Sequence, residues 1–235
     1  MDHIFPSPLV RGVLLKRYKR FLADVELEDG TVVTAHCANT GSMKGCSEPN
    51  SAVYMSKSDN PKRKLAYSLE LIQAGSTWVG INTALPNRIV ESAIERKLLP
   101  QLDPWTHIRR EVKYGKNSRI DLLLESDEAP PCYVEVKNVT LADSGVAKFP
   151  DAVTERGRKH LQEMSEEVAK GNRAAMVYLI QRTDCETFSP AEDIDPAYAK
   201  ALSSALKNGV LAFALEAQPS PEGIVVTRSL PVHIS

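Results

Sequence analysis

Two acidic residues and a lysine lie in adjacent apolar segments near the middle of the 235-residue chain. Asp121 lies in the run 118–125, and Glu135 and Lys137 follow in the run 133–138. Alternate residues of a strand share a face, so Glu135 and Lys137 project together, and a hairpin brings Asp121 beside them. Carboxylate oxygens suit Mg²⁺ or Mn²⁺, and a nearby lysine can activate water or offset charge at phosphorus. The pattern predicts metal-assisted phosphodiester hydrolysis, with Asp121 and Glu135 as the metal ligands.

An exposed cross-strand ion pair is the alternative, because Glu-x-Lys is common and charged pairs often lie on the solvent face of a sheet. The neighbouring side chains favour the site, since a buried charge is costly unless it is paired or metal-bound. The sequence leaves open whether such a site is an active nuclease. The apolar neighbours are Ile120, Leu122, Leu123, Leu124, Val134 and Val136.

The segments that carry this chemistry belong to a mixed α/β pattern that begins near residue 85. A helix capped by Asn87 precedes three strands, and a long amphipathic helix, a strand, a helix and two strands follow. This order predicts a mixed sheet covered by helices on both faces, with an edge strand at 223–228. The other predicted strands are 107–114, 118–125, 132–138, 174–181 and 210–216, and the helices include 196–207.

The first half of the chain has a different pattern. About five short strands follow one another between residues 9 and 82, separated by turn residues such as Glu28-Asp29-Gly30 and Asn60-Pro61. Such a series predicts a small closed barrel, of which the OB fold is one type. The small-residue loop 39–45 is either a phosphate cradle with Lys44 or a tight turn between domains.

The motifs of both halves resemble a known family. Asp-x₁₃-Glu-x-Lys within helix–strand–strand–strand–helix–strand resembles the restriction-endonuclease-like PD-(D/E)xK fold, although Ile120 stands where proline often precedes the aspartate. The segments His36-Cys37-Ala38-Asn39-Thr40-Gly41-Ser42-Met43, 118–121, 133–140, 149–157 and 159–161 are similar to those of the sugar fermentation stimulation protein A family.

This resemblance implies an OB-like domain over residues 1–84 and a nuclease-like domain over residues 85–235. It also implies DNA binding without sequence specificity and a regulatory link to maltose and other sugar metabolism. Membership would not establish nuclease activity, so an active Mg²⁺-dependent nuclease in DNA or RNA processing is the alternative function.

Two further residues are candidates for the catalytic set. Glu91 lies on the helix before the strands, where PD-(D/E)xK enzymes often place an extra acid, but an exposed ion pair with a nearby arginine is the alternative. His160 lies on the helix after Lys137 and shares a stripe with Met164, so a core-edge histidine is the alternative there.

Cations alternate with aromatic residues in the first half. A barrel that binds a nucleic-acid strand uses cations for phosphates and aromatic faces for bases, whereas lysines also protect strand edges from aggregation. The predicted nucleic-acid contacts are Lys16, Arg17, Tyr18, Lys19, Arg20, Lys44, Lys62, Arg63, Lys64 and Arg156.

The overall composition limits these functions. Lys+Arg 29 against Asp+Glu 30 gives a formal net charge of -1, which excludes a uniformly cationic DNA binder but not a locally basic face. No apolar run reaches the roughly 18–20 residues of a membrane span, so we expect a cytoplasmic protein without a membrane partner. The oligomeric state stays open, and a homodimer is compatible with the sequence.

Overall fold

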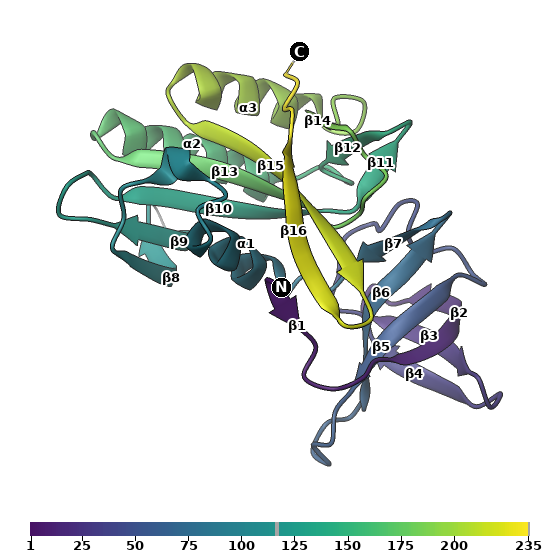
Figure 1. Cartoon of the computed structure of the whole chain (residues 1–235). Helices are drawn as coiled ribbons and strands as arrows, with labels where there is room; N and C mark the ends of the chain where they lie inside the picture. Colours follow the sequence, from purple (N-terminus) through teal and green to yellow (C-terminus); the bar gives the residue numbers. More distant parts are fainter. Residues whose placement is uncertain (116–117, 235) are drawn as a thin grey trace.

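Residues 10–80 form a closed barrel in the computed structural model, which describes residues 1–115 and 118–234 (Figure 1). The strand order is β4-β3-β2-β5-β6-β7, and a parallel pairing of β4 with β6 closes a five-stranded barrel. This is the neighbour order of an OB fold, so the predicted OB-like barrel is confirmed. The strands are β2 (Val10–Tyr18), β3 (Leu22–Leu27), β4 (Val32–His36), β5 (Ala52–Lys57), β6 (Tyr67–Ala74) and β7 (Thr77–Gly80).

The second half forms a seven-stranded mixed sheet, in the order β1-β16-β15-β13-β10-β9-β8, which confirms the mixed α/β prediction. A small sheet of β11 (Leu141–Asp143), β12 (Val146–Phe149) and β14 (Thr187–Pro190) adjoins it. Among the described residues, no helix is long and apolar enough to span a membrane. The main strands are β1 (His3–Ile4), β8 (His107–Tyr114), β9 (Ser118–Glu125), β10 (Cys132–Val139), β13 (Arg173–Ile180), β15 (Leu211–Ser220) and β16 (Gly223–Leu230).

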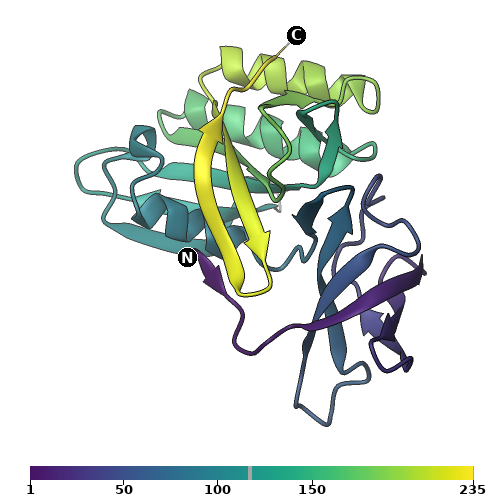
Figure 2. The same cartoon turned by 45° about the vertical axis from the view of Figure 1, so that its right-hand side comes forward.

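Helices cover both faces of the large sheet (Figure 1). α1 (Pro86–Glu95) packs Ile89 and Ile94 against one face, which it shares with barrel residues such as Leu71. α2 (Glu155–Ala169) and α3 (Pro196–Lys207) cover the other face through residues such as Leu161 and Leu202, and a short 3₁₀ helix spans Pro100–Leu102. The sheet therefore lies between two helices on one side and the barrel with α1 on the other (Figure 2).

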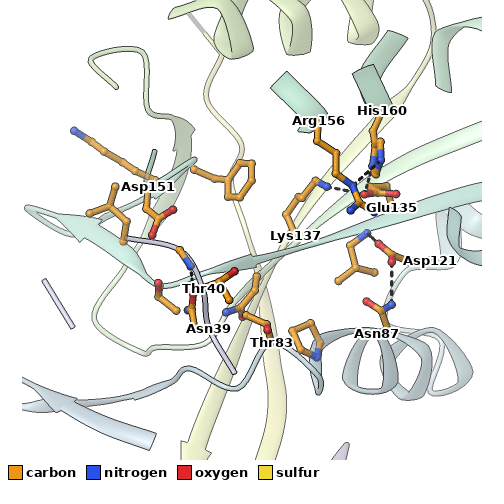
Figure 3. A pocket seen from close by; sticks show the side chains of 18 of the residues that line it. Asn39, Thr40, Thr83, Asn87, Asp121, Glu135, Lys137, Asp151, Arg156 and His160 are labelled. Carbon is orange, nitrogen blue, oxygen red and sulfur yellow. Dashed lines mark hydrogen bonds and ion pairs between the residues drawn. The ribbon is translucent and has the colours of Figure 1, made fainter. Parts of the chain in front are cut away.

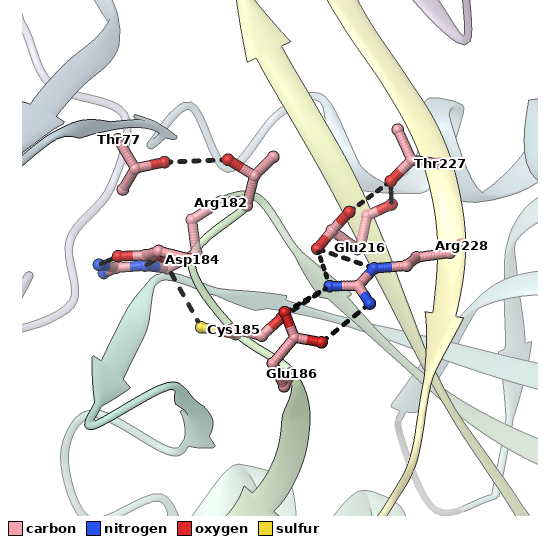
Figure 4. Close-up of polar contacts among 9 residues, drawn as sticks. Thr77, Arg182, Asp184, Cys185, Glu186, Glu216, Thr227 and Arg228 are labelled. Carbon is pink, nitrogen blue, oxygen red and sulfur yellow. Dashed lines mark hydrogen bonds and ion pairs between the residues drawn. The ribbon is translucent and has the colours of Figure 1, made fainter.

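Hydrogen bonds between β7 and the segment after β13 hold the barrel against the sheet. Gly80 N donates to Gln181 O at 2.9 Å, and a Cβ at Gly80 would approach Gln181 Oε1 to 2.4 Å, so a larger residue there would displace the Gln181 side chain. Thr77 Oγ1 and Thr183 Oγ1 lie 3.2 Å apart, beside Arg182, which forms two bonds to Asp184 (Figure 4). Backbone and side-chain bonds thus hold β7 to the segment that follows β13.

β1 joins the large sheet, although it precedes the barrel in the chain. His3 pairs with Ile224, so β16, which the sequence predicts as an edge strand, is covered on its outer side. This prediction is wrong because a strand of two residues leaves no periodic signal. The division of the chain at residue 84 stays a prediction.

Local differences have clear causes. The N-cap of α1 is Leu85, and Asn87, predicted as the cap, lies inside the first turn. β2 and β3 are separated by a turn at Lys19 and Arg20, which lack the glycine or asparagine that signals a hairpin. β11, β12 and β14 are too short for their alternation to be distinguished from loop.

The carboxylate of Asp2 is fully buried at the junction of β1, β16 and α1. It accepts from Val226 N at 2.7 Å and Ser92 Oγ at 2.8 Å, and it pairs with Arg96. Burial by itself raises the pKa of Asp2, but these donors outweigh it and the pKa is lowered.

We expect Asp2→Ala to lower the free energy of unfolding by about 2–3 kcal/mol, because it leaves buried donors without an acceptor. Urea unfolding followed by circular dichroism measures the change. Asp127→Ala, which removes an exposed loop carboxylate, is the control and should leave the midpoint unchanged. Equal midpoints for the wild type and Asp2→Ala would show that this cluster does not stabilise the fold.

Candidate active site

A pocket of about 540 Å³ lies where the barrel meets the large sheet (Figure 3). One wall comes from the barrel and its connection to α1, and the other comes from β9, β10 and the start of α2. The predicted residues Asp121, Glu135, Lys137, Arg156 and His160 all line this pocket. The structure therefore brings together in one cavity side chains from both halves of the chain.

Strands β9 and β10 separate at the pocket. Their pairing runs from Cys132 with Leu124 to Val134 with Leu122 and ends one residue before Asp121. Beyond this point the Asp121 side chain replaces the backbone pairing, because its Oδ2 accepts from Val136 N at 2.8 Å. Ile120 and Leu122, which share a face in a regular strand, pack into different cores, so β9 is twisted at Asp121.

Glu135 and Lys137 project together toward α2, as the strand period requires, while Val134 and Val136 enter the opposite core. Lys137 Nζ donates to Glu135 Oε1 at 2.6 Å, and His160 Nδ1 makes a close contact with the same oxygen. Glu135 is 3% exposed, and its other oxygen, Oε2, is buried with no hydrogen-bond partner. One oxygen of this carboxylate is saturated, and the other is available to a ligand.

His160 is positioned by the first turn of α2. Arg156 Nε donates to His160 Nε2 at 3.3 Å, which places the ring proton on Nδ1, facing Glu135. Thr154 caps the helix by accepting from Gly157 N at 3.0 Å. Asp195, which caps α3, also accepts from Thr154 N at 2.8 Å and so ties the starts of the two helices together.

Asn87 and Glu111 complete the surroundings of Asp121. Asn87 Nδ2 donates to Asp121 Oδ1 at 2.9 Å and approaches Glu111 Oε1 at 3.3 Å. Glu111 lies in β8 with φ of 53°, a left-handed conformation that is uncommon outside glycine and often found at functional sites. Neither Asn87 nor Glu111 was predicted as a site residue from the sequence. The only available signal was the polar side chain of Asn87 in the first turn of a helix.

The two buried carboxylates have opposite pKa shifts. Burial, together with the charge of Glu135, raises the pKa of Asp121 to about 6. Burial also opposes ionisation of Glu135, but Lys137 and His160 outweigh it and the pKa of Glu135 is lowered. At neutral pH both groups are ionised, and the excess negative charge lies at Asp121.

The site is suited to a divalent ion that needs few protein ligands. In residues 1–115 and 118–234, no three His, Cys, Asp or Glu side chains are grouped closely enough to bind a metal by themselves. Mg²⁺ commonly takes one or two carboxylates and completes its shell with water and phosphate oxygens. The unpartnered Oε2 of Glu135 beside Asp121 therefore fits such an ion.

Glu91 does not line this pocket. Its carboxylate forms an ion pair with Arg110 of β8 and borders a separate hollow beside Met1 and His3. Its helical position turns it toward β8, and Asn87, one turn earlier, reaches Asp121 instead. The partner comes from β8 and the Glu91 side chain is only 12% exposed, and a catalytic role for Glu91 stays a prediction.

The predicted barrel contacts divide into engaged and solvent-facing groups. Arg17 donates to backbone carbonyls, and Lys16 and Tyr18 both contact Asp24. Arg63 donates to Ser68 Oγ at 2.9 Å. Lys16 and Arg63 are nevertheless exposed, as are Lys19, Arg20, Lys44, Lys62 and Lys64.

Loop 39–45 lies within the barrel, between β4 and β5, and it contacts the other half of the chain. Asp151 Oδ2 accepts from Ser42 Oγ at 2.9 Å and from Met43 N at 3.0 Å. The loop thus forms a contact between the two halves rather than a turn that connects them, and phosphate binding by Lys44 stays a prediction.

An OB-like barrel joined to a mixed sheet with Asp-x₁₃-Glu-x-Lys on β9 and β10 defines a two-part protein with a restriction-endonuclease-like domain. Family models agree: residues 15–81 match the SfsA N-terminal OB domain, and residues 84–223 match the sugar fermentation stimulation protein RE domain. The chain belongs to the sugar fermentation stimulation protein family.

Individual relatives cover nearly the whole chain. A sugar fermentation stimulation protein homolog of Geobacter sulfurreducens is 55% identical over 97% of this chain and 98% of its own length. The homolog of Rhodospirillum centenum is 56% identical over 96% and 97%. The solved structure of Pyrococcus furiosus SfsA in complex with Ca²⁺ has a TM-score of 0.88 and 29% identity, and it covers 97% of each chain.

We expect the change that Asp121→Asn causes in the free energy of unfolding of the metal-free protein to depend on pH. It should be more favourable at pH 8 than at pH 4.5 by about 1–3 kcal/mol. The pKa of Asp121 is about 6 when folded, above its ordinary 3.8, so the folded wild type loses stability as pH rises through this interval. Urea unfolding in a chelator at both pH values measures the difference. The control Asp127→Asn, which changes an exposed carboxylate, should show no difference between the two pH values. A pH-independent effect of Asp121→Asn would contradict the raised pKa.

Proposed function

We propose that this protein binds DNA without sequence preference and that its pocket hydrolyses a phosphodiester bond with a bound Mg²⁺ or Mn²⁺. The observation that carries the proposal is the state of Glu135, whose Oε1 is saturated while Oε2 is buried and unpartnered beside Asp121. The Pyrococcus furiosus relative was solved in complex with Ca²⁺, which supports divalent-ion binding by this chain.

Asp121 and Glu135 would hold the ion, which would neutralise phosphate charge and lower the pKa of water. The surrounding residues keep these ligands in place. Asn87 and Val136 N hold Asp121, and His160 fixes the rotation of Glu135 by donating to Oε1. Such supporting contacts are important for metal affinity as well as for orientation.

Lys137 is the residue best placed to act on the phosphate. Its side chain is 15% exposed, and Nζ lies 2.6 Å from Glu135 Oε1, at the pocket surface. An ammonium there stabilises negative charge that develops on the phosphoryl oxygens, and it can orient the attacking water. Arg156, exposed at the same pocket, supplies a second cation for a flanking phosphate.

DNA contact is supported by the two loops that OB folds use for binding. The β2–β3 turn contains Lys19 and Arg20, and the β5–β6 loop contains Lys62 and Lys64, all of which are exposed. Cations on flexible side chains contact phosphates, which carry no sequence information. The regulatory link to maltose metabolism stays a prediction that would act through this binding.

The expected effect of Lys137→Met is a loss of Mg²⁺- or Mn²⁺-dependent DNA cleavage by about 100-fold or more, with Mn²⁺ binding retained. Glu135→Ala and Asp121→Ala should lose both DNA cleavage and Mn²⁺ binding, because each removes one of the proposed metal ligands. Cleavage of labelled DNA and calorimetric Mn²⁺ titration separate the two effects, and Lys113→Met, on the exposed edge of β8, is the control. No cleavage of single-stranded, duplex or branched DNA or of RNA would favour the alternative, a binding module with a catalytically inactive site.

DNA affinity should fall steeply as salt rises from about 50 to 200 mM, because each phosphate contact releases counterions. Two unrelated duplexes of equal length should bind equally at each salt concentration. Fluorescence anisotropy measures both. An affinity that does not change with salt, or a strong preference between the duplexes, would overturn binding through the backbone.

A further inference from the structure

The barrel forms a wall of the hydrolytic pocket, which we call the barrel wall and define as Asn39, Thr40, Gly41 and Thr83. We propose that the β2–β3 turn beside this wall binds a single unpaired DNA strand at the pocket, and that Phe21 stacks on a base of that strand. The inference rests on the proposed function for the identity of the pocket, and it adds the class of substrate.

The barrel wall is clamped from two sides. Arg17 Nη2 donates to Asn39 O and Gly41 O, both at 2.9 Å. On the other side, the carboxylate of Asp151 lies against Gly41, where an added Cβ would meet Oδ2 at 3.0 Å. Thr83 Oγ1 also donates to Ala38 O at 3.0 Å. The part-buried, charge-assisted bonds from Arg17 hold the wall to the rest of the barrel, and Asp151 contacts it from the segment after β12.

The β2–β3 turn adjoins the barrel wall. The same Arg17 Nη2 that binds Asn39 and Gly41 also donates to Arg20 O at 2.8 Å, so one nitrogen joins the turn to the pocket. Lys19 and Arg20 have φ of 49° and 67°, both in the left-handed region that glycine and asparagine normally occupy. Long cationic side chains at strained positions indicate that the turn serves binding.

Phe21 follows these two cations and is 46% exposed. Its backbone is fixed, since Phe21 O accepts from Cys37 N at 2.8 Å. An exposed ring beside two cations is the combination with which proteins bind single strands, because bases stack on the ring while phosphates pair with the cations. A duplex, whose bases are already stacked, gains nothing from the ring.

The test compares a fluorescein-labelled strand of roughly 15 nucleotides with the same strand annealed to its complement. Anisotropy with the full chain in EDTA gives both affinities without cleavage. We expect tighter binding of the single strand, a loss of about tenfold in that affinity for Phe21→Ala, and an unchanged duplex affinity. Phe21→Tyr should retain the wild-type value. Val32→Ala, which removes another exposed apolar side chain of the barrel, should have no effect.

Equal affinities for single strand and duplex would overturn the proposal, as would a Phe21→Ala variant that binds the single strand like the wild type. The latter result would assign the exposed ring to a protein partner instead. The test separates this proposal from the proposed hydrolysis. If the protein cleaves no DNA in Mn²⁺ but still binds the single strand through Phe21, only hydrolysis is rejected. Cleavage of duplex DNA at the same rate as single strands would reject the strand selection alone.

Discussion

The site depends on two neighbouring carboxylates, a buried one at Glu135 and a half-buried one at Asp121. Lys137 and His160 outweigh the burial of Glu135 and lower its pKa, whereas burial and the charge of Glu135 raise the pKa of Asp121 to about 6. Keeping this charge imbalance in a folded protein requires support from several elements. α1 supplies Asn87, β10 offers a backbone N–H where its pairing with β9 ends, and the caps of α2 and α3 set the position of His160.

The two parts of the molecule are not separate modules that share a chain. The pocket has one wall from each, and the contacts that join them are specific: a glycine that accommodates Gln181, a threonine pair, and a carboxylate that binds the 39–45 loop. Many OB folds bind nucleic acid on the barrel surface alone. Here the barrel also shapes the cavity in which the carboxylates lie, so under the proposed function one surface would both bind and position a phosphodiester.

The period of two along a strand was sufficient to predict those site residues whose positions depend on strand geometry alone. A period of two places Glu135 and Lys137 on one face, and a hairpin brings Asp121 near, so both the mixed sheet and this trio could be predicted. The roles of Asn87 and Glu111 could not, because they depend on a helix rotation and on a left-handed backbone at one position of β8. Glu91 has the residue type expected of the site but faces Arg110. The β2–β3 turn carries no hairpin signal, because Lys19 and Arg20 are unlike the residues that usually form one.

The pairing of β1 with β16 makes the barrel an insertion between the first strand of the large sheet and its first helix. Closing that pair joins positions 3 and 224, a loop that includes almost the entire polypeptide, and long-range closures of this kind slow folding. During synthesis, the barrel has all its strands long before the sheet does, so it can fold first as a compact unit. The sheet then assembles beside a preformed neighbour, and the last hairpin to leave the ribosome captures the first strand.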